Sequence, residues 1–448
     1  MGAAYNSQER HPAPRCLPGT RRAAFQEVET WAKAGSNGKN ILWLHGPAGA
    51  GKSAIAQTIA ETYAGRDELA ASFFFARTVA NRNSVKHLFP TIAVQIALSA
   101  PEMRRKLDRI LKSDPFIAER ALGSVDLMAS LFQRGSSLVP PSQFLIVIDG
   151  LDECQGRDEQ RRILAEIAHM VKTHNIPLRF LIVSRPEAHI CEAFEEPNLV
   201  DIAGRLSVYG GLQAEADVAK YLRSEFSRIH NAKRHKDVME FIPRPWPSED
   251  VIDTLVTKSG GYFIFASTVI NFIDEENFSP ADRLDQVLNI SNSSDSAPFA
   301  ELDKLYLQIL SSCPTSKLPT LRHILGYVVF SSVMDPSAVV GVLDIEELLR
   351  LLPGEVRLVL RGLRSLVLFE TWQCGTISIY SNHASFRDFL HDKERSKDYH
   401  VDFEEWVYTA FCDAFSLGCK ELGLSVKIGI KSTSPTLKGL FVAFNISL

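Results

Sequence analysis

Residues 41–53 read Ile-Leu-Trp-Leu-His-Gly-Pro-Ala-Gly-Ala-Gly-Lys-Ser. Residues 41–45 form a short, largely apolar run typical of a strand, and residues 54–63 have the character of a helix. Between them lies the pattern Gly-x-x-x-x-Gly-Lys-Ser in the setting of strand, turn and helix that it requires. Its glycines let successive backbone N–H groups point inward, and the following helix adds its positive end. The turn is therefore predicted to bind a triphosphate.

Two side chains of this turn are expected to contact the ligand directly. Lys52 is predicted to reach the β- and γ-phosphates, and the Ser53 hydroxyl to bind Mg²⁺. The alternative is an ordinary strand–helix turn that happens to contain glycines, which the complete pattern in this setting disfavours. The pattern predicts nucleotide binding and leaves the use of the nucleotide open. The residues expected to line the site are Gly46, Pro47, Ala48, Gly49, Ala50, Gly51, Lys52, Ser53 and Ala54.

Composition limits the class of protein. The chain has 448 residues, 45% of them hydrophobic and 23% charged, which is typical of a globular protein with two to four domains. The net charge of −4 gives no overall attraction to nucleic acid or membranes, so neither is expected as a partner. The seven cysteines include no Cys-x-x-Cys pair, and no basic-then-apolar leader is present. A cytoplasmic protein with reduced thiols is expected.

A second informative stretch, residues 144–153, ends in the sequence Asp-Gly-Leu-Asp-Glu at 149–153, here called the acidic loop. The five apolar residues before it show no alternation, which predicts a strand buried on both faces of a parallel sheet. Asp149 at its carboxyl end is expected to hold Mg²⁺ through water, opposite Ser53. Asp152 or Glu153 is placed to position or deprotonate the attacking water. The alternative for this acidic pair is an ordinary solvated loop.

A further strand is predicted at residues 179–183, followed by Ser-Arg-Pro at 184–186. Arg185 is placed to contact a γ-phosphate by a charge-assisted hydrogen bond, and the alternative is an arginine at the domain surface. Residues 198–202 are a possible fifth strand. Strands alternating with helices over residues 40–203 predict an α/β fold with a parallel, doubly wound sheet.

From about residue 210 the pattern changes to helices, and a small hairpin is predicted at 367–371 and 376–381. Helices followed by one hairpin suggest a winged-helix unit. Its preceding helix carries only three arginines, so a protein-facing role is favoured over DNA reading. The expected divisions are a disordered N-terminus (1–15), the P-loop NTPase domain (16–205), a helical domain (206–290), a linker (291–300), a winged-helix domain (301–400), and a C-terminal helical segment and tail of unclear structure (401–448).

With these motifs in hand, the chain resembles the NACHT-type STAND NTPases, particularly the fungal NOD-like receptors that share a nephrocystin-3-like NTPase module. The resemblance covers roughly residues 16–400. It rests on residues 46–53, the acidic loop, Ser-Arg-Pro at 184–186, Leu-Asp-Lys-Leu-Tyr at 302–306, and residues 383–390.

The resemblance implies a switch that closes around ADP, opens on exchange for ATP, and then forms a homo-oligomer that signals to proteins the sequence does not identify. Such roles include innate immunity and heterokaryon incompatibility. The resemblance makes Arg185 the γ-phosphate sensor and His383 the winged-helix histidine that bonds the β-phosphate of ADP. It also makes residues 16–21 a turn that lines the base, with Thr20 as a candidate contact. Slow ATP hydrolysis with Mg²⁺ is expected.

Two other functions remain open from the sequence. One is a phosphotransferase or kinase acting on a small substrate, which leaves about 250 residues of helical sequence unexplained. The other is a scaffold in which the nucleotide is a structural ligand, which the intact Lys52, Ser53, Asp149 and Glu153 set argues against.

Overall fold

The structure is a computed structural model, and it divides into two compact units, Met1–Ser227 with Pro247–Ala266, and Arg228–Trp246 with Ser267–Leu448. The predicted linker at 291–300 lies, apart from residue 300, outside the described residues. The structure describes residues 2–34, 38–77, 79–99, 101–117, 127–128, 130–131, 144–174, 178–208, 212–289, 300–334, 341–371, 376–381, 383–402, 405–406, 408–409, 425–432 and 440–447.

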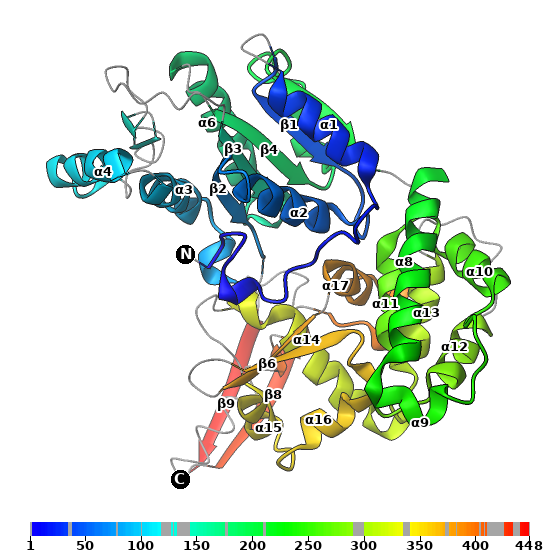
Figure 1. The fold of residues 1–448 in the computed structure, drawn as a ribbon. Coiled ribbons are helices and arrows are strands. Elements are labelled where there is room, and N and C mark those ends of the chain that lie inside the picture. Colours follow the sequence, from blue (N-terminus) through cyan, green and yellow to red (C-terminus); the bar gives the residue numbers. More distant parts are fainter. Residues whose placement is uncertain are drawn as a thin grey trace. The chain divides into compact units, whose positions relative to one another are not determined.

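The first unit is built on a five-stranded parallel sheet in the order β2-β3-β4-β1-β5 (Figure 1). The strands are β1 (Ile41–His45), β2 (Leu69–Phe74), β3 (Phe144–Asp149), β4 (Leu178–Ser184) and β5 (Ala203–Ser207). The apolar run before the acidic loop is therefore an interior strand, as predicted, and β4 separates it from β1. This confirms the α/β fold of a P-loop NTPase for the first unit.

The fifth strand was predicted in the wrong place. Residues 198–202 form a turn, and the strand follows at Ala203–Ser207. This strand lies at the edge of the sheet, and only Ala203 is buried, while its other residues are half-buried or exposed. Edge strands lack the continuous apolar run that marks an interior one, which is why the sequence signal was missed.

Helices cover both faces of the sheet, because successive residues of each strand point to opposite sides. On one face, Leu42 and Leu44 of β1 pack with Ile55 and Ile59 of the helix after the phosphate loop. On the other, Ile41 and Trp43 belong to a larger core. The helices of this unit's sheet region are α1 (Arg22–Lys33), α2 (Lys52–Ala64), α3 (Val85–Ser99), α4 (Pro101–Ser113), α6 (Arg157–His174) and α7 (Ala188–Ala193).

The N-terminal segment packs against the sheet, in place of the disorder expected for residues 1–15. Residues 3–15, here called the N-terminal strap, run beside edge strand β2. The N–H of Phe74 donates to the Ala3 carbonyl (2.9 Å), and the N–H of Tyr5 donates to the Ser72 hydroxyl (2.9 Å). A strand edge presents unpaired backbone groups, and the strap supplies a partner for one of them, the N–H of Phe74.

Farther along, the strap contacts helix α2. The guanidinium of Arg10 donates to the Gln57 side-chain oxygen (2.7 Å) and lies over the ring of Phe74, 3.4 Å from its centroid. Arg15 forms an exposed ion pair with Glu61 (2.8 Å). Gln57 is buried, so its bond to Arg10 satisfies a polar group that water does not reach.

Two helices contribute residues to both units, α8 (Leu212–Asn231) and α11 (Phe263–Ile273). Helix α10 (Glu249–Ser259) belongs to the first unit. In the second unit are α9 (Lys236–Met239), α12 (Pro280–Leu288), α13 (Ala300–Leu310), α14 (Leu318–Met334), α15 (Val342–Leu348), α16 (Glu355–Val359), α17 (Ala384–His391) and α18 (Lys393–Ser396). Among the described residues, no helix has both the length and the apolar character needed to cross a membrane.

The predicted hairpin of the second unit is present. Strands β6 (Val367–Thr371) and β7 (Ile377–Ser381) pair antiparallel after helices α14 to α16. The assignment of these elements to a winged-helix domain stays a prediction. In the tail, β8 (Ser425–Ser432) and β9 (Leu440–Ser447) form a second antiparallel pair.

We expect the strap to contribute measurably to stability through Arg10. Arg10→Ala leaves the buried Gln57 oxygen without this donor, which should lower the free energy of unfolding by about 1–3 kcal/mol. Arg15→Ala removes only an exposed ion pair and should cost about 0–1 kcal/mol. Denaturant unfolding of both variants measures the difference, and equal losses would contradict a specific role for Arg10.

Candidate functional site

The phosphate loop, residues 46–53, connects β1 to α2 and has little room for side chains. A Cβ atom on Gly46 would lie 2.4 Å from the carbonyl oxygen of Val208, so only glycine fits without a backbone shift. Gly49 has φ +73°, and a Cβ atom there would lie 2.1 Å from a methyl carbon of Ile264. The loop conformation therefore depends on glycine at both positions. The remaining loop residues Pro47, Ala48 and Ala54 are half-buried.

Two carbonyls of the loop accept hydrogen bonds from outside it. The N–H of Ile264, in the first turn of α11, donates to the Gly49 oxygen (3.2 Å). The Arg21 guanidinium donates to the Ala50 oxygen (2.6 Å). A phosphate ligand needs the loop's N–H groups to point inward, which turns the carbonyls outward. Donors that hold these carbonyls pre-organise the loop.

The side chain of Lys52 folds back onto the phosphate loop. Its ammonium donates to the Pro47 carbonyl (2.8 Å). Burial lowers the pKa of Lys52 below its usual value, and the nearby Asp152 carboxylate opposes that shift. A half-buried ammonium bonded to a carbonyl is well placed to gain from an anionic ligand.

Arg21 was missed by the sequence reasoning, which pointed to its neighbour Thr20. Thr20 is buried and its hydroxyl donates to the Leu17 carbonyl (2.7 Å). Arg21 has φ +55°, its N–H donates to the Asp217 carboxylate (2.9 Å), and its guanidinium lies 4.8 Å from the centroid of the Phe263 ring. Its partners are distant in sequence, so no local pattern marked it.

Asp149 and Ser53, the two predicted metal ligands, lie close together. Asp149 is buried at the end of β3, and the nearby Ser53 side chain acts to lower its pKa. Burial raises the pKa of Asp149 to about 6, while Ser53 and the Arg10 charge act in the opposite direction. A carboxylate and a hydroxyl are the hard oxygen donors that Mg²⁺ prefers, so these residues fit that ion. Their assignment as ligands stays a prediction.

Arg10 is the second residue that the sequence reasoning missed. It belongs to the strap, and its charge acts on Asp149 from the side of Phe74 and Gln57. Burial lowers the pKa of Arg10 to about 10, which still leaves it charged at neutral pH. Residues read as disordered thus supply a fixed positive charge near the predicted metal ligand.

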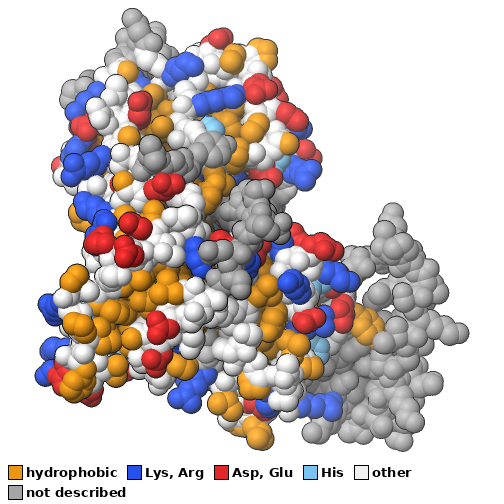
Figure 2. All heavy atoms as spheres, turned by 90° about the vertical axis from the view of Figure 1, so that its right-hand side faces the viewer, with side chains coloured by type: hydrophobic (Ala, Val, Ile, Leu, Met, Phe, Trp, Pro, Cys, Tyr) orange, Lys and Arg blue, Asp and Glu red, His pale blue; other side chains and the backbone are white. Residues whose placement is uncertain are grey.

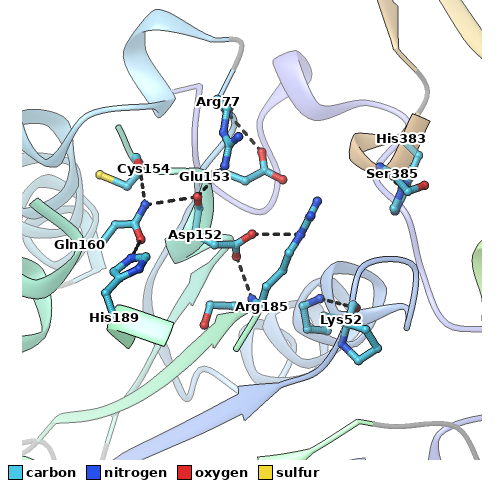
Figure 3. A network of polar contacts seen from close by, with 12 residues as sticks. Lys52, Arg77, Asp152, Glu153, Cys154, Gln160, Arg185, His189, His383 and Ser385 are labelled. Carbon is cyan, nitrogen blue, oxygen red and sulfur yellow. Dashed lines mark hydrogen bonds and ion pairs between the residues drawn. The ribbon is translucent and has the colours of Figure 1, made fainter. Parts of the chain in front are cut away.

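The acidic loop is tied to the segment after β4 (Figure 3). One Asp152 oxygen accepts the N–H of Arg185 (3.0 Å), and the other lies 3.3 Å from the Arg185 Nε. Glu153 accepts the N–H of Arg77 (3.1 Å), whose guanidinium donates to the Asp152 carbonyl (3.0 Å). Asp152 and Arg185, predicted separately, therefore form an ion pair. Their predicted roles at a phosphate stay predictions.

His383 lies in the second unit, at the start of α17. Its Nδ1 accepts the N–H of Ser385 (3.0 Å), which places the proton of the neutral ring on Nε2. The Ser385 hydroxyl also bonds Tyr306 (2.8 Å) in a buried contact. The ring of His383 is thus held in a defined orientation, and its contact with a nucleotide stays a prediction.

Residues 19–185 match the family model described as Nephrocystin 3, N-terminal. This stretch is similar to the nephrocystin-3 NTPase module. It contains the phosphate loop, the acidic loop and Arg185, so the nephrocystin-3-like module of this chain holds the whole predicted site except His383. No curated protein matches the chain.

Three solved structures are similar to much of the chain. The Drosophila ORC bound to DNA is 12% identical with a TM-score of 0.40, covering 91% of this chain and 97% of that one. Cdc6p from Pyrobaculum aerophilum is 14% identical with a TM-score of 0.37, covering 86% and 95%. The Aeropyrum pernix ORC1 protein in complex with DNA is 13% identical with a TM-score of 0.38, covering 84% and 92%.

The expectation that nucleic acid is not a partner is corrected by these findings, since two of the three proteins are described as bound to DNA. The expectation rested on a net charge of −4, which averages over the whole chain. On the face drawn in Figure 2, basic and acidic side chains are interspersed, with hydrophobic ones gathered toward the left. A total charge does not describe such a surface, so it excludes no class of partner.

We expect Asp149→Asn to stabilise the protein in a pH-dependent way. The folded-state pKa of Asp149, about 6, lies above its ordinary value of 3.8, so ionising this group costs stability as the pH rises between these values. At pH 7.5, in EDTA and without nucleotide, the variant should be more stable by about 2–3 kcal/mol. The advantage should shrink toward zero near pH 4, and denaturant unfolding across this range measures it. An advantage independent of pH would contradict this origin.

Proposed function

We propose that this chain is an ATP- and ADP-binding NTPase whose nucleotide controls its conformation, of the NACHT-type STAND class found in fungal NOD-like receptors. Hydrolysis of ATP is slow in this proposal, and the protein acts in the cytoplasm. The proposal rests on the phosphate loop, the acidic loop and the match of residues 19–185 to the nephrocystin-3 N-terminal model. The helical domain at 206–290 and the winged-helix domain at 301–400 are part of it.

One observation favours a switch over a plain enzyme. The N–H of Ile264 donates to the Gly49 carbonyl, and Ile264 lies in the first turn of helix α11, whose later residues belong to the second unit. Filling the phosphate loop fixes its carbonyls and so acts on the first turn of α11. A ligand shifts a conformational equilibrium only by binding one form more tightly, and this contact is one that nucleotide can strengthen.

The residues of the nephrocystin-3-like module divide the chemistry among them. Ser53 and Asp149 would hold Mg²⁺, which neutralises phosphate charge when bound. Lys52 binds the β- and γ-phosphates, and Asp152 or Glu153 orients the attacking water. Arg185 now pairs with Asp152, and a γ-phosphate offers it a second anionic acceptor that ADP lacks.

His383 is the proposed contact that distinguishes the ADP form. The resemblance to NACHT-type proteins assigns it to the β-phosphate. Its bond from the Ser385 N–H fixes the Nε2–H as the donor side of the neutral ring. A donor supplied by the second unit to a ligand of the first would stabilise only a closed arrangement, which is the differential affinity that a switch needs.

The identity of nucleotide that co-purifies with the chain tests the proposal. We expect mass spectrometry of the denatured protein to find ADP in the wild type. Lys52→Ala should reduce the bound fraction and weaken ADP affinity about 10- to 100-fold, because a charge-assisted contact to phosphate is lost. Lys33→Ala, which alters an exposed lysine paired with Glu29, is the matched control and should behave as wild type. Equal nucleotide content in all three proteins would contradict the proposal that the phosphate loop binds the nucleotide through Lys52.

A second experiment tests the role of His383. We expect His383→Ala to accelerate ADP release about tenfold, the effect of one lost hydrogen bond to a charged group. His391→Ala changes an exposed histidine of the same helix and should leave release unchanged. Stopped-flow release of a fluorescent ADP analogue gives both rates. An unchanged rate in His383→Ala would exclude it as a nucleotide contact.

A further inference from the structure

Behind the acidic loop lies a buried pair of polar side chains that the proposed chemistry does not use (Figure 3). Gln160 of α6 donates through its Nε2 to the Cys154 carbonyl (2.7 Å) and to the Asp152 carbonyl (3.3 Å). Its Oε1 lies 2.6 Å from Nε2 of His189 in α7. Gln160 is 5% exposed and His189 is 9% exposed, so water does not substitute for these contacts.

The direction of each bond follows from the partners. Main-chain carbonyls only accept, so the NH₂ group of Gln160 must face them and its oxygen must face His189. Nε2 of His189 therefore carries the proton and donates to Gln160. Burial lowers the pKa of His189, consistent with a neutral ring in this place. Only one orientation of the amide satisfies all three contacts.

The same pair joins two loops at the carboxyl edge of the sheet. Gln160 holds the main chain at Asp152, while Arg185 holds the carboxylate of that residue. Arg185 and His189 both follow strand β4, four residues apart. The segment after β4 thus contacts the acidic loop in two ways. Arg185 pairs with the Asp152 carboxylate, and His189 bonds Gln160, which in turn bonds the Asp152 carbonyl.

We propose that Gln160 and His189 are positioning residues for nucleotide hydrolysis, which fix the main chain of the acidic loop so that Asp152 and Glu153 face the γ-phosphate. This inference rests on the proposed function. The hydrogen bonds of Gln160 and His189 to other described residues do not involve the phosphate loop, so their loss should impair the chemical step and spare nucleotide binding. Small displacements of positioned groups carry large rate penalties.

The test compares single-turnover ATP hydrolysis with ADP affinity in full-length variants. Gln160→Met keeps the bulk of the side chain and removes all three bonds. It should slow hydrolysis about 10- to 100-fold while the Kd for ADP changes less than about twofold. Gln155→Met makes the same exchange at an exposed site just after the acidic loop and should match wild type. His189→Gln keeps an N–H donor and should retain most of the rate, whereas His189→Phe should not.

Several results would overturn the inference. Wild-type hydrolysis rates in Gln160→Met and His189→Phe would do so. So would parallel losses of rate and ADP affinity, because a merely structural role lowers both. If Gln160→Met does not fold, the comparison of His189→Gln with His189→Phe decides the matter alone. A wild type that binds ATP without hydrolysing it overturns this inference and leaves nucleotide binding standing, whereas a wild type that binds no nucleotide overturns the proposed function itself.

Discussion

The conformation of the phosphate site depends on the hydrogen bonds that the carbonyl groups of its loop accept. A loop that cradles phosphate with its N–H groups must direct its carbonyls away from the ligand, and buried carbonyls need donors. Here the donors for Gly49 and Ala50 are Ile264 and Arg21, which lie outside the loop and far from it in sequence. The loop is consequently shaped by the turn before α1 and by the start of α11. In the proposed switch, phosphate binding acts on both elements through these two hydrogen bonds.

Burial of the Asp149 carboxylate costs electrostatic free energy. Burial raises the pKa of Asp149 to about 6, so an ionised Asp149 destabilises the fold at neutral pH. Ser53 and Arg10 offset part of that cost, and a divalent cation would offset more. Asp152 differs from Asp149 because it forms a direct ion pair with Arg185. Burial thus destabilises the ionised form of Asp149, whereas the charge of Asp152 is balanced by its ion pair with Arg185.

Local sequence patterns were enough to find the parts of the site that follow from chain periodicity. The phosphate loop and the interior strand before Asp149 were predicted because a glycine pattern and an uninterrupted apolar run are local signals. The strap and Arg21 were missed because their partners lie tens to hundreds of residues away, and such contacts leave no periodicity. Edge strand β5 was misplaced for a related reason, since Ala203 is its only buried residue and the strand therefore lacks an apolar run. Asp152 and Arg185 were each found, but their pairing required the order of strands in the sheet.

Hydrogen–deuterium exchange at the first turn of α11 tests the central claim most directly. The amide of Ile264 is bonded to the Gly49 carbonyl, so its exchange reports on the link between loop and helix. The account predicts that adding ADP slows exchange in the peptide covering residues 263–273 as well as in the phosphate loop. Protection confined to the loop, with unchanged exchange in α11, would contradict it.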